Sequence, residues 1–250
     1  MKKLNMDDVQ EYVEKHIAIF HQQRLDSVKT NLNLKTLLKH KNPYFYKAKN
    51  VFTARQLIQC MAEAYLQSSE ETKFGEFMEG LALFVCNSVY GATQISKKKG
   101  MDFRFEKDGI LYIVECKSGW NWGNSDQIIS LKRKSIEWKE TGKNIVIVNG
   151  CCFGNRKNDA EKAGFHKFCG QDFWYFISND DELYLKIIEP IGHRAKQKNE
   201  EFDIAYEGLI HKTTLEFASQ YCDDGGIIDW KKLVKFNSGR KVKSGNKKRN

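Results

Sequence analysis

Apolar residues recur at helical spacing along the first part of the chain. Residues 6–24 carry them at intervals of three and four positions, which predicts an amphipathic helix. Residues 41–47 (KNPYFYK) predict a loop, and a second helix is expected from Thr53 to beyond Leu66. The chain therefore begins with a helical part.

A further long helix is predicted to begin at Ser68, because Ser68 and Glu71 have the spacing of a capping box. This helix carries apolar residues on both of its sides, as buried helices do. Two of its acids, Glu76 and Glu79, lie one turn apart. In such a helix they must be paired, face a cleft or bind a metal, although a solvated or salt-bridged helix acid is an equally good interpretation of either.

The spacing of apolar residues changes from a helical to a strand pattern after Gly100. Residues 101–106 and 110–117 are predicted strands, and Asp108-Gly109 between them is the dipeptide that favours a two-residue type I′ hairpin. The two segments therefore predict an antiparallel pair.

The remaining segments alternate between helix and strand. The apolar run 144–149 predicts a central strand, and a helix over 126–141 precedes it, ended by Gly142. Three further elements are expected, namely strands over 172–178 and 183–188 and a helix over 201–221. This order predicts an α/β domain with a mixed sheet flanked by helices.

The hairpin brings three charged residues together. With a two-residue loop, opposed residues have numbers that add to 217, so Asp102 lies across from Glu115 with Cβ atoms about 5 Å apart. Lys117, two positions later, shares that face. A three-residue loop would make the relation between the two acids diagonal.

Two carboxylates at the end of an apolar strand repel each other and lose hydration. A magnesium ion resolves this conflict, since it prefers oxygen ligands. Lys117 beside them can orient a water molecule or contact a phosphate, and together these groups suit phosphodiester hydrolysis. The alternative is a surface ion pair, because this spacing of acids and lysine also arises by chance.

Charge is unevenly distributed along the chain. The net charge is +9, and the segment after Trp230 holds nine Lys or Arg and no acid, so the rest is neutral. A basic tail binds polyanions such as nucleic acid, or it merely aids solubility.

Composition excludes several other classes. No apolar run is long enough to cross a bilayer and no signal peptide precedes the first helix, so a cytoplasmic location is expected. The seven cysteines form no CxxC pair, and His166 with Cys169 lacks a second pair, which disfavours zinc. Cys86 and Cys116 are expected in the core.

The residues Gly100-Met101-Asp102 and Tyr112-Ile113-Val114-Glu115-Cys116-Lys117 resemble the motif of the PD-(D/E)XK nuclease superfamily. Met101 stands where the motif has proline. Further stretches between residues 41 and 193, among them Lys117 to Ser125, are similar to type II restriction endonucleases that cut GGNCC-type sites.

The resemblance implies a restriction-endonuclease-like fold and a Mg²⁺-dependent homodimer that cuts both strands of double-stranded DNA at a short palindromic site, leaving 5′-phosphate and 3′-hydroxyl ends. It also implies a protecting DNA methyltransferase in the host. Asp102 and Glu115 would bind the metal, with Glu79 as a third ligand and Glu76 as the second choice. Lys117 would position or activate water. The candidate DNA contacts are Asn121, Asn124, Ser125, Gln127, Lys97 and Lys98.

Three parts are expected: a helical N-terminal part (1–67) for DNA contact or dimerisation, a catalytic core (68–228), and a basic, flexible tail (229–250). The rival functions are a repair or junction-resolving nuclease of the same fold, a DNA-binding protein that does not cut, and a zinc or thiol enzyme.

Overall fold

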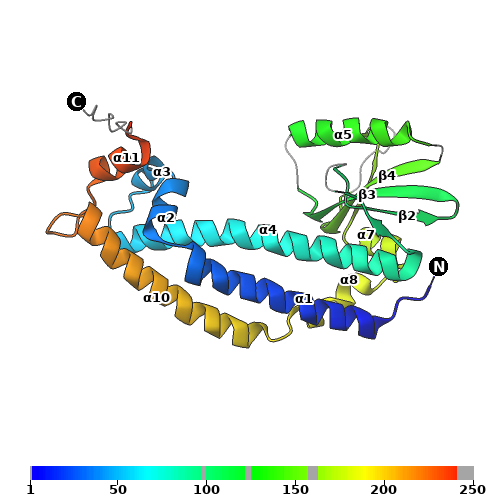
Figure 1. The fold of residues 1–250 in the computed structure, drawn as a ribbon, viewed down its shortest axis with the longest axis horizontal. Coiled ribbons are helices and arrows are strands. Elements are labelled where there is room, and N and C mark those ends of the chain that lie inside the picture. Colours follow the sequence, from blue (N-terminus) through cyan, green and yellow to red (C-terminus); the bar gives the residue numbers. More distant parts are fainter. Residues whose placement is uncertain (1, 97–99, 122–124, 143, 157–162, 241–250) are drawn as a thin grey trace, which may run out of the picture. The chain divides into compact units, whose positions relative to one another are not determined.

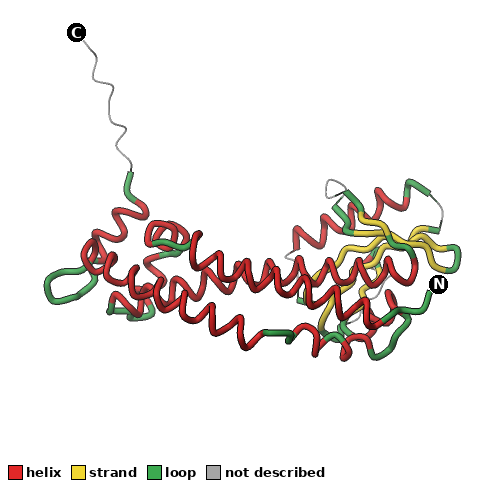
Figure 2. Tube along the Cα trace, turned by 60° about the horizontal axis from the view of Figure 1, so that its bottom comes forward, coloured by secondary structure: helices red, strands yellow, loops and turns green. Residues whose placement is uncertain are grey.

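The computed structural model describes residues 2–96, 100–121, 125–142, 144–156 and 163–240. The chain divides into two compact units (Figures 1 and 2), each formed from two separate segments. Unit 1 comprises Met1–His21 and Glu71–Ala195, and unit 2 comprises Gln22–Glu70 and Lys196–Asn250. No helix among the described residues has the length and apolar character needed to span a membrane.

The sheet of unit 1 is mixed, as predicted. Its described strands follow the order β1-β2-β3-β4-β5, with antiparallel pairing from β1 to β3 and parallel pairing from β3 to β5. The strands are β1 (Thr93–Gln94), β2 (Phe103–Lys107), β3 (Ile110–Gly119), β4 (Ile145–Phe153) and β5 (His166–Cys169). The last of these was not predicted, because its four residues are too few to establish a period.

The β2–β3 hairpin has the predicted register. Its pairs run from Phe103 opposite Val114 to Lys107 opposite Ile110. The two loop residues have positive φ, 54° at Asp108 and 74° at Gly109, as a type I′ turn requires.

Helices cover both faces of this sheet (Figure 1). On one face α5 (Ser125–Lys139) packs Leu131 against Ile113 and Ile147. On the other, the C-terminal part of α4 (Ala54–Tyr90) and α7 (Gln171–Ser178) form the main core. The buried residues there include Leu81, Val85, Phe103, Val114, Cys116, Val148, Phe173 and Trp174. Cys86 and Cys116 are buried, as expected.

The prediction of a new helix at Ser68 was wrong, because α4 runs without interruption from Ala54 to Tyr90. A capping box forms only where the chain enters the helix at the serine. Residues 54–74 contain neither proline nor glycine, so nothing breaks the helix before Ser68.

The predicted loop at 41–47 is largely helical. Asn42 caps α3 (Pro43–Ala48) by accepting a hydrogen bond of 3.0 Å from the Tyr44 amide, and Pro43 occupies the first turn. The short helix α2 (Leu34–His40), capped by Asn33, was not predicted. Short helices with strong caps leave little apolar periodicity to detect.

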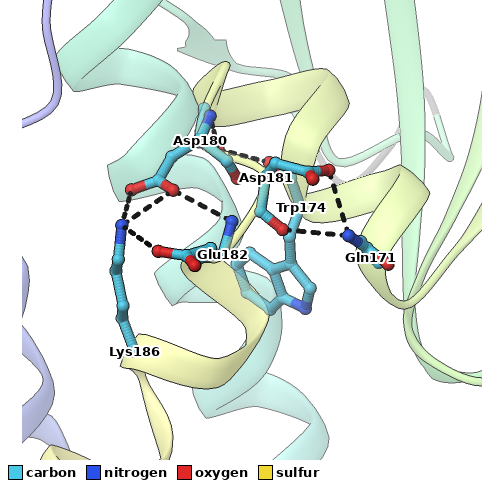
Figure 3. A network of polar contacts seen from close by, with 7 residues as sticks. Gln171, Trp174, Asp180, Asp181, Glu182 and Lys186 are labelled. Carbon is cyan, nitrogen blue, oxygen red and sulfur yellow. Dashed lines mark hydrogen bonds and ion pairs between the residues drawn. The ribbon is translucent and has the colours of Figure 1, made fainter.

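Two predicted strands, 172–178 and 183–188, are also helical: α7 covers the first, and α8 (Leu183–Lys186) with α9 (Ile188–Ile191) covers the second. The aromatic residues of α7 mimic a buried strand, but local polar contacts decide otherwise (Figure 3).

Asn179 ends α7 with a left-handed φ of 58°. The Asp180 carboxylate then accepts hydrogen bonds from the Glu182 amide at 3.0 Å and from Lys186 Nζ at 2.8 and 2.9 Å. These contacts form a turn that leads directly into α8.

Unit 2 is helical and has its own core. Besides α2 and α3 it contains the end of α1 (Met6–Asp26), a π-helical turn over Ser27–Asn31, the start of α4, α10 (Ala195–Tyr221) and α11 (Trp230–Ser238). Its buried residues include Leu37, Leu57, Ile58, Met61, Ile210, Phe217 and Leu233. The predicted first helix, 6–24, and the predicted 201–221 helix are confirmed as α1 and α10.

The observed units have boundaries that differ from the three predicted parts. Residues 22–67 of the predicted N-terminal part and the whole of the predicted tail belong to unit 2, whereas residues 1–21 belong to unit 1. The start of that tail is ordered: α11 buries Leu233, and Asn237 Nδ2 donates a hydrogen bond of 2.6 Å to the Leu38 carbonyl. Residues 241–250 lie outside the described residues.

Candidate active site

Asp102 lies immediately before β2, while Glu115 and Lys117 lie on β3. The ladder between the two strands ends at Phe103 and Val114, so Asp102 is not in a regular pair with Glu115. Instead the Asp102 amide donates to the Val114 carbonyl at 2.9 Å. Its carboxylate Oδ2 accepts a hydrogen bond of 2.6 Å from the Cys116 amide. Asp102 is therefore tied to the β3 segment that carries the other two residues.

Glu115 is a buried carboxylate, with 9% of its surface exposed. Its Oε1 lies 3.4 Å from Lys117 Nζ, whereas Oε2 is buried and accepts no hydrogen bond from the described residues. Burial raises the pKa of Glu115, and Lys117 and Lys134 oppose the rise without cancelling it. A buried acceptor of this kind is costly unless a proton, a cation or a water molecule satisfies it.

Lys117 stays charged among the acids. Burial lowers the pKa of its ammonium group, but the carboxylates of Glu115, Asp102 and Glu79 together outweigh burial and raise it. The ammonium is thus held as a cation beside these three acids.

Glu79, on α4, faces the same charges. Burial, followed by the nearby Asp102 carboxylate, raises the pKa of Glu79 to about 7, and Lys117 counteracts part of this rise. Glu76 and Glu115 contribute to it as well. Because Glu76 is exposed, Glu79 is the better placed of the two helix glutamates.

Lys134 on α5 joins this site, although the sequence analysis did not single it out. Its Nζ donates a hydrogen bond of 3.0 Å to the Gly100 carbonyl, two residues before Asp102. Gly100 has a φ of 68°, and a Cβ there would lie 2.5 Å from Cε of Lys134. Glycine suits this position because it tolerates the positive φ and leaves room for the lysine.

The donor set suits a hard cation such as Mg²⁺, because it offers carboxylate oxygens and includes the buried, unbonded Oε2 of Glu115. In the described part of the chain, no three His, Cys, Asp or Glu side chains are gathered closely enough to form a metal cluster as they stand. The Asp102 carboxylate is near enough to raise the pKa of Glu79 and of Glu115, although the acids do not form a preassembled metal cluster.

The predicted DNA-contacting residues are placed only in part. Asn121 follows β3 and is exposed, and Ser125 and Gln127 are exposed in the first turn of α5. Asn124, Lys97 and Lys98 lie outside the described residues.

Trp120, just after β3, contacts two cations that the sequence analysis missed. Lys167 Nζ donates a hydrogen bond of 2.7 Å to the Trp120 carbonyl, and the guanidinium of exposed Arg156 lies 5.5 Å from the centre of the Trp120 ring. Both cations come from other parts of the chain, so no local spacing could have revealed them.

A mixed sheet whose central strand carries a buried ExK motif, with an aspartate bonded to it from the start of the neighbouring strand, defines a restriction-endonuclease-like fold. The comparison with protein families agrees with this class. The model of the family "Type II restriction endonuclease EcoO109I" matches residues 7–199. The chain belongs to this family and is a site-specific deoxyribonuclease, a hydrolase. No curated protein matches the chain.

The family match begins well before residue 41, where the sequence analysis placed the start of the likeness. It includes α1, α2 and α3, and therefore parts of both units.

Proposed function

We propose that the protein hydrolyses both strands of duplex DNA at a short palindromic site in a Mg²⁺-dependent reaction. The observation that carries this proposal is the buried Glu115, whose Oε2 accepts no hydrogen bond from the described residues while Oε1 contacts Lys117. A stable protein without metal chemistry gains nothing from such a carboxylate.

Asp102, Glu115 and Glu79 would hold the Mg²⁺ ion. When bound, the ion offsets charge on the phosphate and lowers the pKa of water. The Cys116 amide keeps Asp102 oriented toward β3, and the contact with Glu115 orients the Lys117 ammonium. Lys117 then holds the attacking water beside the phosphate.

The bond changes follow from hydrolysis at phosphorus. A water oxygen bonds to phosphorus as the bond between phosphorus and the 3′ oxygen breaks. The 3′ oxygen takes up a proton, so one product ends in a 3′-hydroxyl and the other in a 5′-phosphate.

The target site and the partners are inferred from the family. We infer a GGNCC-type target, a homodimer that presents one site to each strand, and a host methyltransferase that protects the same sequence. Asn121, Ser125 and Gln127, with Asn124, Lys97 and Lys98, are the proposed DNA contacts. The enzyme would act in the cytoplasm, where bacterial DNA lies.

The decisive experiment is digestion of a sequenced, unmethylated viral DNA by wild type, Glu115→Gln and Glu106→Gln, each with Mg²⁺ or EDTA. Glu106 is the matched control, because it is an exposed acid on the other strand of the hairpin. We expect discrete fragments from wild type and Glu106→Gln in Mg²⁺ alone, and none from Glu115→Gln.

Other outcomes would support the rivals. Cutting at branches or nicks regardless of sequence indicates a repair or junction-resolving nuclease. Binding without cutting in any divalent metal indicates a DNA-binding protein. Loss of cutting after thiol alkylation or zinc chelation indicates a zinc or thiol enzyme.

A further inference from the structure

The net charge of the protein resides on unit 2. By sequence, unit 1 has 21 Lys and Arg and 21 Asp and Glu, whereas unit 2 has 20 basic and 11 acidic residues. The active site described above lies in unit 1, so its chemistry does not account for the excess.

Within unit 2 the charges are separated. Residues 27–62 contain seven Lys or Arg and no acid, and residues 230–240 contain four and no acid. The acids concentrate in residues 196–229, which hold eight acids and three lysines. Figure 1 shows α2, α3 and α11 gathered on one side of unit 2, and α10, which carries most of these acids, running along another.

Two of the acid-free segments meet at a groove. Helices α3 and α11 pack together, and a groove of about 420 Å³ lies between them. The surface of the groove is mainly apolar and is formed by Pro43, Tyr44, Trp230 and Val234. Three exposed lysines border it, which we call the basic platform: Lys47, Lys231 and Lys235.

The platform lysines are not neutralised within the protein. Lys47 Nζ lies 5.5 Å from the centre of the Trp230 ring, a contact that orients the ammonium without cancelling its charge. Across the described residues, none of the three forms an ion pair with a carboxylate. Three unneutralised ammonium groups on a folded helix pair are a surface for a polyanion.

We propose that the basic platform binds the phosphate backbone of duplex DNA, so that unit 2 contributes affinity without sequence specificity. The proposal rests on the proposed function only in taking duplex DNA as the partner. A second copy of the chain fits less well, because a twofold contact over this groove would bring the platform lysines of both copies together. Lysine contacts to phosphates give affinity that falls as salt rises, without reading bases.

The test compares two triple variants of the full chain with equal loss of charge. Lys47→Gln, Lys231→Gln and Lys235→Gln together remove the platform. Lys15→Gln, Lys196→Gln and Lys212→Gln together remove three exposed helix lysines elsewhere. Binding to a 30-base-pair duplex without a GGNCC site is measured in EDTA across a range of salt concentrations, so that no cleavage intervenes.

We expect the platform variant to bind at least about tenfold more weakly at 0.1 M salt, with the slope of log K against log salt smaller by about 2 to 3. The control should resemble wild type. Equal weakening in both variants would overturn the proposal, since it would mean that only the total charge matters. Unchanged DNA binding with altered oligomeric state by light scattering would also overturn it and would assign the platform to a contact between copies.

A third variant separates charge from packing. Lys47→Arg, Lys231→Arg and Lys235→Arg together keep the charge and should retain wild-type binding and salt slope; loss of binding there would contradict the proposal. If the wild type binds DNA through the platform but cuts nothing, the proposed catalysis fails while this inference stands.

Discussion

The Cys116 amide donates a hydrogen bond of 2.6 Å to Oδ2 of Asp102, across the end of the β2–β3 ladder. Cys116 lies between Glu115 and Lys117 on β3, and its own side chain is buried in the core. One backbone group thus holds the first acid of the site against the strand that supplies the other two residues. The position of Asp102 depends on the strand end and not on a regular cross-strand pair.

This contact separates the structural role of Asp102 from its proposed catalytic role. Asp102→Asn keeps an oxygen that can accept the Cys116 hydrogen bond but removes the negative charge. We expect cleavage to fall by about 100- to 1000-fold, with little change in the urea midpoint. Asp102→Ala should lose cleavage and also about 1–2 kcal/mol of stability, because the amide then lacks a partner. Full activity in Asp102→Asn would remove this residue from the site.

The hairpin was predictable because its determinants are local. Asp108 and Gly109 tolerate positive φ, and their position alone sets which residues of β2 and β3 face each other. The spacing of Glu115 and Lys117 on one strand follows from the same geometry. The absence of a regular pair between Asp102 and Glu115 was not predictable, because the position of Asp102 depends on its hydrogen bond to the Cys116 amide.

Two kinds of feature were missed. The aromatic run of α7 has strand-like composition, which concealed the local turn at Asn179 and Asp180 that separates two helices. Lys134 reaches Gly100 from a helix that crosses between β3 and β4. Sequence spacing places that helix over the sheet without showing which of its side chains reaches the site.

The raised pKa of Glu79 predicts a pH-dependent cost in stability. Because folding raises this pKa from 4.5 to about 7, the protonated form favours the fold below about pH 4.5. This contribution of Glu79 to the free energy of unfolding is lost as pH rises through 7. Without divalent cations, Glu79→Gln should therefore be more stable than wild type at pH 8, by roughly 2–3 kcal/mol, and equal to it near pH 4.

Chemical denaturation at both pH values measures this difference, with Glu76→Gln as the control, because Glu76 is exposed. Added Mg²⁺ should stabilise wild type at pH 8 more than Glu79→Gln if Glu79 binds the metal. Equal pH dependence in the two proteins would contradict the placement of Glu79 among the active-site charges.

Asp180 predicts the opposite pH dependence at the α7–α8 corner. Burial raises the pKa of its carboxyl, but hydrogen bonds from Lys186 and the Glu182 amide outweigh burial and lower it. Its stabilisation is thus present above the unfolded pKa of about 4 and is lost as pH falls through the lower folded pKa. Asp180→Asn should reduce stability by about 1 kcal/mol at pH 7 and by less near pH 2.

Urea titration at the two pH values tests this expectation, and Glu182→Gln is the matched change. Glu182 also contacts Lys186, at 3.4 Å, but its side chain is 71% exposed. Removing the Glu182 carboxylate should change the free energy of unfolding by less than about 0.5 kcal/mol. An equal effect of both substitutions would show that the hydrogen bonds of Asp180 contribute no more than a surface ion pair.

Lys134 should act as a positioning residue. Lys134→Met keeps the aliphatic length that packs near Gly100 but removes the hydrogen bond to its carbonyl and the positive charge near Glu115. We expect kcat to fall about tenfold while DNA affinity in EDTA is unchanged, because the backbone before Asp102 loses its anchor. Lys132→Met, an exposed neighbour on the same helix, should leave kcat unchanged. Lys134→Arg can still donate to the Gly100 carbonyl and should recover part of the loss. If Lys134→Met instead weakens DNA binding at unchanged kcat, the lysine contacts DNA and does not position Asp102.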